Sequence, residues 1–287
     1  MRIATFDQRA VIVTDEGLID VADASAGRFS SSTDDLVGRL DELGEWFAAG
    51  GVEPTWDLDP DVVARDPRLG PVVSRPSQIF GIGLNYRRHA IEMGMTPPTT
   101  PLVFTKFASS LAGATASVTL PSTHTDWEAE LVVVIGARAR HVAARDALRY
   151  VAGYCVGQDF SDRDLQMSGT PPQFSLGKSH ENFSPIGPWL TTPDECANPD
   201  DLRITCDVND VRYQDSSTED MVTNVAGLIA YLSSVCEIRA GDVIFTGSPA
   251  GVGQGHTPPV FLTPGDVVTS TILGLGSLRN VTSNATR

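Results

Sequence analysis

Long apolar runs are missing from this sequence. No segment approaches the about 20 consecutive apolar residues that a membrane-spanning helix needs, and the first residues lack the apolar stretch of a signal peptide. We therefore expect a cytoplasmic protein that makes no membrane contact. The hydrophobic content of 41% is ordinary for a soluble globular chain, and 287 residues suffice for one large domain with or without a small second one.

Paired cysteines and a basic surface are missing as well. No two cysteines form a Cys-x-x-Cys pair, so neither a zinc site nor a disulfide framework is indicated for Cys155, Cys196, Cys206 and Cys236. The net charge of −15 argues against nucleic acid as a partner, because phosphates need a basic surface. It also means that an anionic substrate has to be held by local cations.

Two glutamates stand at the start of an apolar, β-branched run that ends at Gly136. Glu128 and Glu130 are two positions apart, so on a strand both carboxylates point to one face. Two carboxylates held that close repel each other unless a cation lies between them, and a hard divalent ion prefers such oxygen ligands. The alternative is a strand edge with both glutamates in water, since acidic side chains are usually exposed.

A second apolar segment favours the metal site over the strand edge. This segment begins near Tyr150 and ends in the acid Asp159, which is followed by Arg163, Gln166 and Lys178. Hard divalent ions are commonly held by carboxylates. Three carboxylates at strand ends, with Arg, Gln and Lys nearby, therefore predict a metal site that keeps room for an anionic ligand.

The chain divides near residue 72. Residues 1–72 contain strand candidates at 3–6, 10–14 and 18–22, followed by a helix that starts after Ser32 or Thr33. Residues 73–287 are mainly short β-rich segments, with helical stretches around 87–93, 143–150 and 223–236. Because strands and helices do not alternate, a doubly wound sheet is not expected. The expected fold is α+β and mostly β, with a small N-terminal α+β domain and a mixed β-roll or barrel core.

Three other features have more than one interpretation. The segment Gly81–Tyr86 lacks the third glycine of a dinucleotide-binding loop and no clear βαβ unit follows it, so a turn is the better account. His89 and Glu92 are three residues apart and can hydrogen-bond on a helix, either as a surface pair or as a functional dyad. Lys106 is either a cation of the site or an exposed strand lysine.

These motifs, in this order and spacing, resemble the fumarylacetoacetate hydrolase family from about residue 75 to about residue 280. The resemblance implies a β-roll core of the kind found in the C-terminal domain of that family, a homodimer, and a bacterial branch that acts on acylpyruvates and related diketo acids. It rests on Gly83-Leu84-Asn85-Tyr86 with His89 and Glu92, Glu128-x-Glu130, Asp159-x3-Arg163-x2-Gln166, Gly177-Lys178, Pro185-Ile186-Gly187-Pro188-Trp189, Gly241-Asp242-Val243-Ile244, Thr246-Gly247-Ser248-Pro249 and Gly251-Val252-Gly253.

The resemblance also implies roles for single residues. It implies a small anionic keto acid as substrate and Mg²⁺ or Mn²⁺ as the cofactor. A mobile lid helix would carry a water-activating dyad and lie displaced when no ligand is bound. The implied roles are metal ligands for Glu128, Glu130 and Asp159, the dyad for His89 and Glu92, oxyanion stabilisation for Lys178, and substrate binding for Arg163, Gln166 and Ser248.

The reaction predicted in this way is hydrolysis of a carbon–carbon bond through a metal-stabilised enolate. The same enolate chemistry supports decarboxylation of oxaloacetate or isomerisation of a hydroxymuconate, and these remain the alternatives. A third alternative is a non-catalytic metal-binding protein, because a fold alone does not fix a function.

Overall fold

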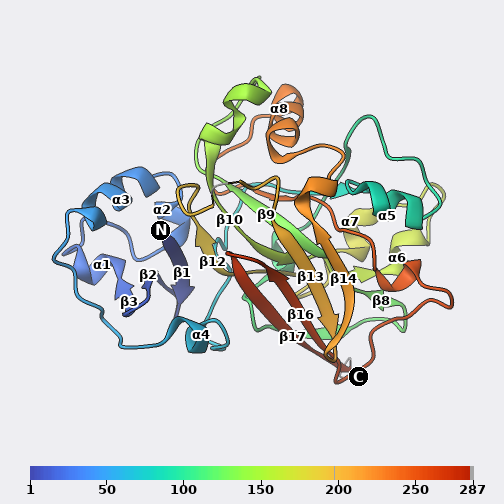
Figure 1. Ribbon diagram of the computed structural model, residues 1–287, viewed down its shortest axis with the longest axis horizontal. Coiled ribbons are helices and arrows are strands. Elements are labelled where there is room, and N and C mark those ends of the chain that lie inside the picture. Colours follow the sequence, from blue (N-terminus) through green and yellow to red (C-terminus); the bar gives the residue numbers. More distant parts are fainter. Residues whose placement is uncertain (197, 285–287) are drawn as a thin grey trace.

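Strands dominate the computed structural model, which describes residues 1–196 and 198–284 (Figure 1). They form a ten-stranded sheet, a five-stranded sheet and a two-stranded sheet, with both parallel and antiparallel neighbours. The expected α+β, mostly β fold is therefore confirmed. The sheets stay open, so among the described residues no closed barrel forms.

The ten-stranded sheet provides the frame of the molecule. Its strands lie in the order β3-β2-β1-β12-β10-β9-β15-β4-β5, and β6 pairs with β12. Their bounds are β1 Arg2–Phe6, β2 Arg9–Thr14, β3 Gly17–Asp20, β4 Ile79–Gly83, β5 Leu102–Thr105, β6 Leu111–Ala112, β9 Ala129–Ile135, β10 Val151–Gln158, β12 Ser184–Thr191 and β15 Val243–Phe245.

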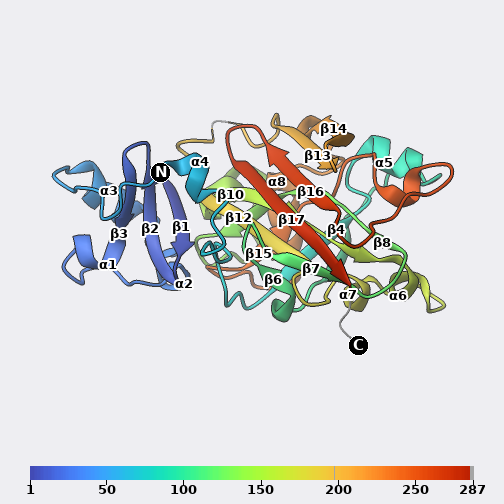
Figure 2. The same ribbon diagram turned by 90° about the horizontal axis from the view of Figure 1, so that it is seen from below.

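The N-terminal strands belong to this same sheet. β1 pairs antiparallel with β12, with Arg2 opposite Thr191, so β1, β2 and β3 extend one end of the sheet (Figure 2). The three strands expected in the first 22 residues are confirmed. The single helix expected after Ser32 is instead interrupted at 37–39. The helices of this region are α1 Val21–Ala24, α2 Thr33–Leu36, α3 Leu40–Ala48 and α4 Pro60–Val63.

The five-stranded sheet packs beside the centre of the large one. Its order is β14-β13-β16-β17-β7, and side chains such as Ile204 and Ile272 share a core cluster with Leu131 and Val133 of β9. The alternate residues of β9 belong to a second core cluster, so the strand is buried on both faces and reads as an unbroken apolar run. The bounds are β7 Ser117–Leu120, β13 Arg203–Val208, β14 Val211–Ser217, β16 Val267–Ile272 and β17 Gly276–Asn284.

Short helices gather at the end of the molecule opposite the N-terminal strands (Figure 1). They are α5 Arg87–Glu92, α6 Arg163–Met167 and α7 Phe174–Gly177. The two-stranded sheet pairs β8 Thr125–Asp126 with β11 Ser161–Asp162, and β11 immediately precedes α6. β9 begins and β10 ends at this edge. The carboxylates predicted from the sequence therefore lie here.

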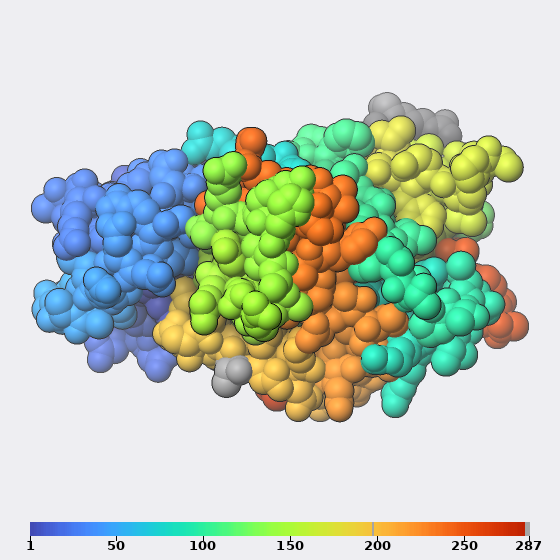
Figure 3. Space-filling view, turned by 90° about the horizontal axis from the view of Figure 1, so that it is seen from above, coloured from blue at the N-terminus to red at the C-terminus, as the bar shows by residue number. Residues whose placement is uncertain are grey.

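The longest helix, α8 Val225–Val235, lies away from that edge. Its N-cap is Asn224, whose side chain accepts from the Gly227 N–H, and the helix packs against the 3₁₀ helix η2 Ala144–Tyr150 (Figure 3). The other 3₁₀ helices are η1 Ala108–Ser110, η3 Thr218–Asp220 and η4 Gly253–Gly255. Within the part of the chain that the structure describes, no helix is long and apolar enough to cross a membrane.

Candidate active site

Three buried carboxylates meet where β9 and β10 pair. Glu128 immediately precedes β9, Glu130 lies in it opposite Gly157 of β10, and Asp159 immediately follows β10. One oxygen from each side chain lies within 4.8 Å of the others. Glu130 is only 1% exposed, so the strand-edge alternative, with both glutamates in water, does not describe this site.

The donor set fits a hard divalent ion. All three groups are carboxylates, the ligands that Mg²⁺ and Mn²⁺ prefer. Burial raises the pKa of Glu130 well above its usual range, and the charges of Asp159 and Glu128 raise it further. A divalent cation would relieve that repulsion, because it puts positive charge between the three groups.

Two lysines neutralise part of the acidic charge. Lys178 Nζ donates to Glu128 at 2.6 Å and to Asp159 at 2.8 Å. Lys106 Nζ donates to Asp159 and to the carbonyl of Lys178. Lys106 is 3% exposed, so it is a cation of the site and not a surface lysine.

The low lysine count of the sequence is an indication that Lys106 belongs to the site, and the prediction from its own strand did not use it. The sequence contains only two lysines, against 19 arginines, and both lie buried here. Burial lowers the pKa of Lys106 despite the opposing Asp159 charge. Burial also acts against the charge of Lys178, but Asp159 and Glu128 outweigh it and the pKa is raised. Each lysine is thus tied to the carboxylates as an internal counter-ion.

Arg163, the first residue of α6, holds carboxylates of the protein itself. Its guanidinium donates to Asp126 at 2.9 and 2.7 Å, to Glu128 at 2.7 Å and to Gln166 at 2.9 Å. The family resemblance implies substrate binding for Arg163, but most of its N–H groups are engaged within the site. Burial works against ionisation of Glu128, yet Lys178 and Arg163 outweigh it and lower the pKa.

Asp126 is a site residue to which sequence reasoning gave no role. It is fully buried, pairs with Arg163, and accepts hydrogen bonds from the backbone of Gly253 at 2.6 Å and of Gln254 at 3.0 Å. Its position two residues before Glu128 was the available signal, because strand residues at that spacing share a face. Asp126 thus joins Arg163 to the loop at η4.

The histidine and glutamate of α5 form the expected dyad. His89 Nδ1 lies 3.1 Å from Glu92 Oε2, and Glu92 Oε1 accepts from the Gly251 N–H at 2.9 Å. A Cβ at Gly255 would lie 2.4 Å from Glu92 Cδ, so only glycine lets the carboxylate approach this loop. The α5 helix is docked against this loop in the structure, and His89 is 7% exposed.

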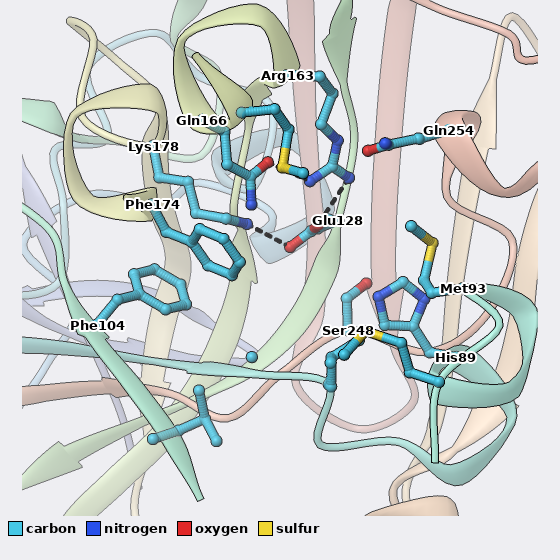
Figure 4. A pocket seen from close by; sticks show the side chains of 15 residues that line it. His89, Met93, Phe104, Glu128, Arg163, Gln166, Phe174, Lys178, Ser248 and Gln254 are labelled. Carbon is cyan, nitrogen blue, oxygen red and sulfur yellow. Dashed lines mark hydrogen bonds and ion pairs between the residues drawn. The ribbon is translucent and has the colours of Figure 1, made fainter. Parts of the chain in front are cut away.

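His89 of the dyad and Glu128 of the carboxylate cluster line one pocket (Figure 4). Ser248 lies beside His89, and its hydroxyl accepts from Gln214 Nε2 at 2.8 Å. Lys178, Gln166 and Arg163 line the side of Glu128 away from His89. Polar lining residues are His89, Glu128, Arg163, Gln166, Lys178, Ser248 and Gln254, and apolar ones include Met93, Met95, Phe104, Met167 and Phe174.

Comparison with known families identifies the chain at the family level. The family model described as "Fumarylacetoacetate (FAA) hydrolase C-terminal" matches residues 78–282, which is most of the sequence. The chain belongs to the fumarylacetoacetate hydrolase family. The matched region contains the triad, both lysines and the dyad.

Relatives of this fumarylacetoacetate hydrolase family member cover nearly its whole length. A Burkholderia multivorans protein, provisionally named a hydrolase, is 44% identical over 275 residues, which span 94% of this chain and 95% of the relative. A crystal structure from Mycobacterium smegmatis, provisionally identified as HpcE, is 43% identical and superposes with a TM-score of 0.93 over 100% of both chains.

A more distant solved relative has a named reaction. Maleylpyruvate hydrolase from Sphingobium sp. SYK-6, crystallised with manganese(II) and pyruvate, is 26% identical with a TM-score of 0.79 over 100% of both chains. The fumarylacetoacetate hydrolase family therefore includes a solved hydrolase with a divalent ion. This chain has a buried carboxylate triad of its own that suits such an ion.

Proposed function

We propose that the protein hydrolyses acylpyruvates to pyruvate and a carboxylic acid, with Mg²⁺ or Mn²⁺ as the cofactor. The observation that carries this proposal is that His89, which is hydrogen-bonded to Glu92, lines the same pocket as Lys178 and as Glu128 of the buried carboxylate cluster. A base, a charged cluster and space between them are the parts that hydrolysis needs.

The carboxylates of Glu128, Glu130 and Asp159 would hold the divalent ion. When bound, the ion supplies Lewis-acid stabilisation of negative charge on the pyruvyl oxygens. Lys106 and Lys178 keep the carboxylates in place, since each donates to Asp159. These contacts limit the movement of the site before substrate arrives.

His89 is the general base of the proposed reaction. Glu92 engages Nδ1, so Nε2 is the ring nitrogen that remains for a water molecule in the pocket. His89 takes a proton from water, and the water oxygen bonds to the acyl carbonyl carbon. The bond between that carbon and the adjacent methylene then breaks, its electron pair stays with the pyruvyl part, and a proton from His89 completes pyruvate.

Lys178 would stabilise the negative charge that develops during this attack. Its ammonium already lies between Glu128 and Asp159 and borders the pocket. A preorganised cation in a buried site stabilises negative charge more strongly than a cation in water, because it does not reorganise during the reaction. The chain thus provides its own electrostatic stabilisation beside the ion site.

The test is pyruvate release by the His89→Ala variant. We expect kcat for acylpyruvate hydrolysis to fall by about 10²–10⁴-fold, the usual worth of general-base help, with ion affinity unchanged. Glu92→Gln should lower kcat less, since Glu92 only orients the imidazole. The matched control is His141→Asn, which removes an exposed histidine elsewhere and should leave kcat at the wild-type value.

Other outcomes of the assay identify the competing reactions. Decarboxylation of oxaloacetate needs no activated water, so an enzyme that turns over oxaloacetate faster than any acylpyruvate, and tolerates His89→Ala, is a decarboxylase. Conversion of a hydroxymuconate without pyruvate release indicates an isomerase. No turnover of any of these compounds indicates a metal-binding protein without catalysis.

We also propose that the active form is a homodimer.

A further inference from the structure

We infer that the pocket selects acylpyruvates whose acyl group is apolar, and discriminates against those that end in a second carboxylate. This inference rests on the proposed function and names the substrate class for the same site. It is argued from the apolar wall, defined as Met93, Met95, Phe104, Met167 and Phe174.

The apolar wall begins at the charged cluster and runs to the mouth of the pocket. Lys178 Nζ lies 5.3 Å from the centroid of the Phe104 ring, and the Phe104 and Phe174 rings are 5.8 Å apart in an edge-on arrangement. Met95 and Met167 are each about half exposed, so they mark the outer end. Figure 4 shows Phe104 and Phe174 on one side of the pocket and Met93 with His89 on the other.

The cations of the pocket are already committed to carboxylates of the chain. Lys178 contacts Glu128 and Asp159, and Arg163 contacts Asp126 and Glu128. These are the only lysine and arginine side chains in the lining, which falls within the described residues. A carboxylate at the far end of a substrate would therefore lose water without gaining an uncommitted lysine or arginine as a partner.

Charge balance leads to the same conclusion. The cluster contains four carboxylates, those of Asp126, Glu128, Glu130 and Asp159, and three cations, those of Lys106, Lys178 and Arg163. Its formal charge is −1, which becomes +1 when a divalent ion binds. One pyruvyl carboxylate neutralises that charge, and a second carboxylate would be in excess within a chain of net charge −15.

The composition of the wall suits acyl groups of varied shape. Methionine side chains are unbranched and polarisable, so they adapt to differently shaped apolar groups, and they make favourable contacts with aromatic rings. The three methionines and two phenylalanines of the wall can thus pack against an alkyl or an aryl group. Each methylene buried in such a wall is worth about 10–200-fold in specificity.

The experiment compares butanoylpyruvate with succinylpyruvate in the manganese-loaded enzyme. The two compounds share the pyruvyl end and the chain length, and differ only in a terminal methyl or carboxylate. We expect kcat/KM for pyruvate release to be at least about tenfold higher for butanoylpyruvate, mainly through KM. Equal values, or a preference for succinylpyruvate, would overturn the inference.

Binding to the His89→Ala variant answers the same question without turnover. Titration calorimetry with each compound should show at least about tenfold tighter binding of butanoylpyruvate. If the wild type releases no pyruvate from either compound, the proposed hydrolysis fails, and the calorimetric ratio still decides the apolar preference. If pyruvate is released but succinylpyruvate binds as tightly, only the inference fails.

A charge-introducing variant tests which residues set the preference. Phe174→Arg places a cation in the wall, so the ratio of kcat/KM for the two compounds should shift toward succinylpyruvate by at least about tenfold. Phe174→Leu should keep the wild-type preference. Leu176→Arg adds the same charge on the same helix at a position that is 61% exposed and outside the lining, and it should leave the ratio unchanged. An equal shift in Leu176→Arg would contradict a role for the wall.

Discussion

Replacement of Lys106 by methionine should make the protein depend on a divalent ion for stability. Lys106 is buried and donates to Asp159, so the variant leaves Asp159 with Lys178 as its remaining cation. Loss of one partner of a buried pair costs about 3–5 kcal/mol, and because Asp159 keeps its contact with Lys178, the expected loss is about 3 kcal/mol. For a chain of this size each kcal/mol moves Tm by about 2–4 °C, so the metal-free variant should melt at least about 6 °C lower.

A bound divalent ion should restore most of the stability that the Lys106→Met substitution removes. With Lys106 absent, the formal charge of the cluster falls from −1 to −2, and the attraction for a divalent cation increases. An ion present at about 100 times its Kd stabilises a protein by about 2.7 kcal/mol, which nearly offsets the loss. The rise in Tm between EDTA and excess manganese should therefore be larger in Lys106→Met than in the wild type.

The assay is thermal unfolding of both proteins in EDTA and in manganese. The matched control is Arg203→Met, which breaks the exposed pair with Asp215 and should cost no more than about 1 kcal/mol under either condition. If Lys106→Met melts like the wild type in EDTA, or gains no more from manganese, then Lys106 is not the counter-ion of the carboxylate cluster.

Three further predictions follow from the structure. Gly255→Ala should lower kcat by about tenfold or more while Tm changes little, because a Cβ 2.4 Å from Glu92 Cδ displaces the dyad. Steady-state kinetics measures kcat, and a melting curve measures Tm. Asp20→Asn should lower Tm at pH 7 by about 2–6 °C. Burial opposes ionisation of Asp20, but Arg9 and the Asp23 N–H outweigh it and lower the pKa, so this stabilisation is present above the unfolded pKa and lost as the pH falls through the folded pKa. The Tm difference between Asp20→Asn and the wild type should disappear below about pH 4. A Tm difference that does not change with pH would contradict the ion pair. Light scattering should give twice 30.6 kDa for the homodimer, and a mass of 30.6 kDa at micromolar concentration would contradict it.

The position of the carboxylates could be predicted from sequence because it follows from local geometry. Glu128 and Glu130 share a strand face, and Asp159 ends the next apolar strand, so two periodicities suffice to bring them together. The dyad could be predicted for a similar reason, since three residues on a helix make almost one turn.

Other parts of the site depend on contacts that no local pattern specifies. Asp126 and Arg163 are 37 residues apart, and their pairing depends on how β8 and α6 are placed by the rest of the fold. Likewise, the pairing of β1 with β12 joins residues almost 190 positions apart. Lys106 was undecided because a single lysine on a strand is usually exposed, and only its partners decide otherwise.

The burial of both lysines has a consequence for amine chemistry. Acylating reagents, amine cross-linkers and lysine-modifying enzymes find no ε-amino group on the outer surface, because Lys106 and Lys178 are at most 3% exposed and each is hydrogen-bonded to Asp159. Apart from the α-amino group, every such reaction has to take place within the site. The extent of amine labelling thus becomes a direct readout of whether the site is open.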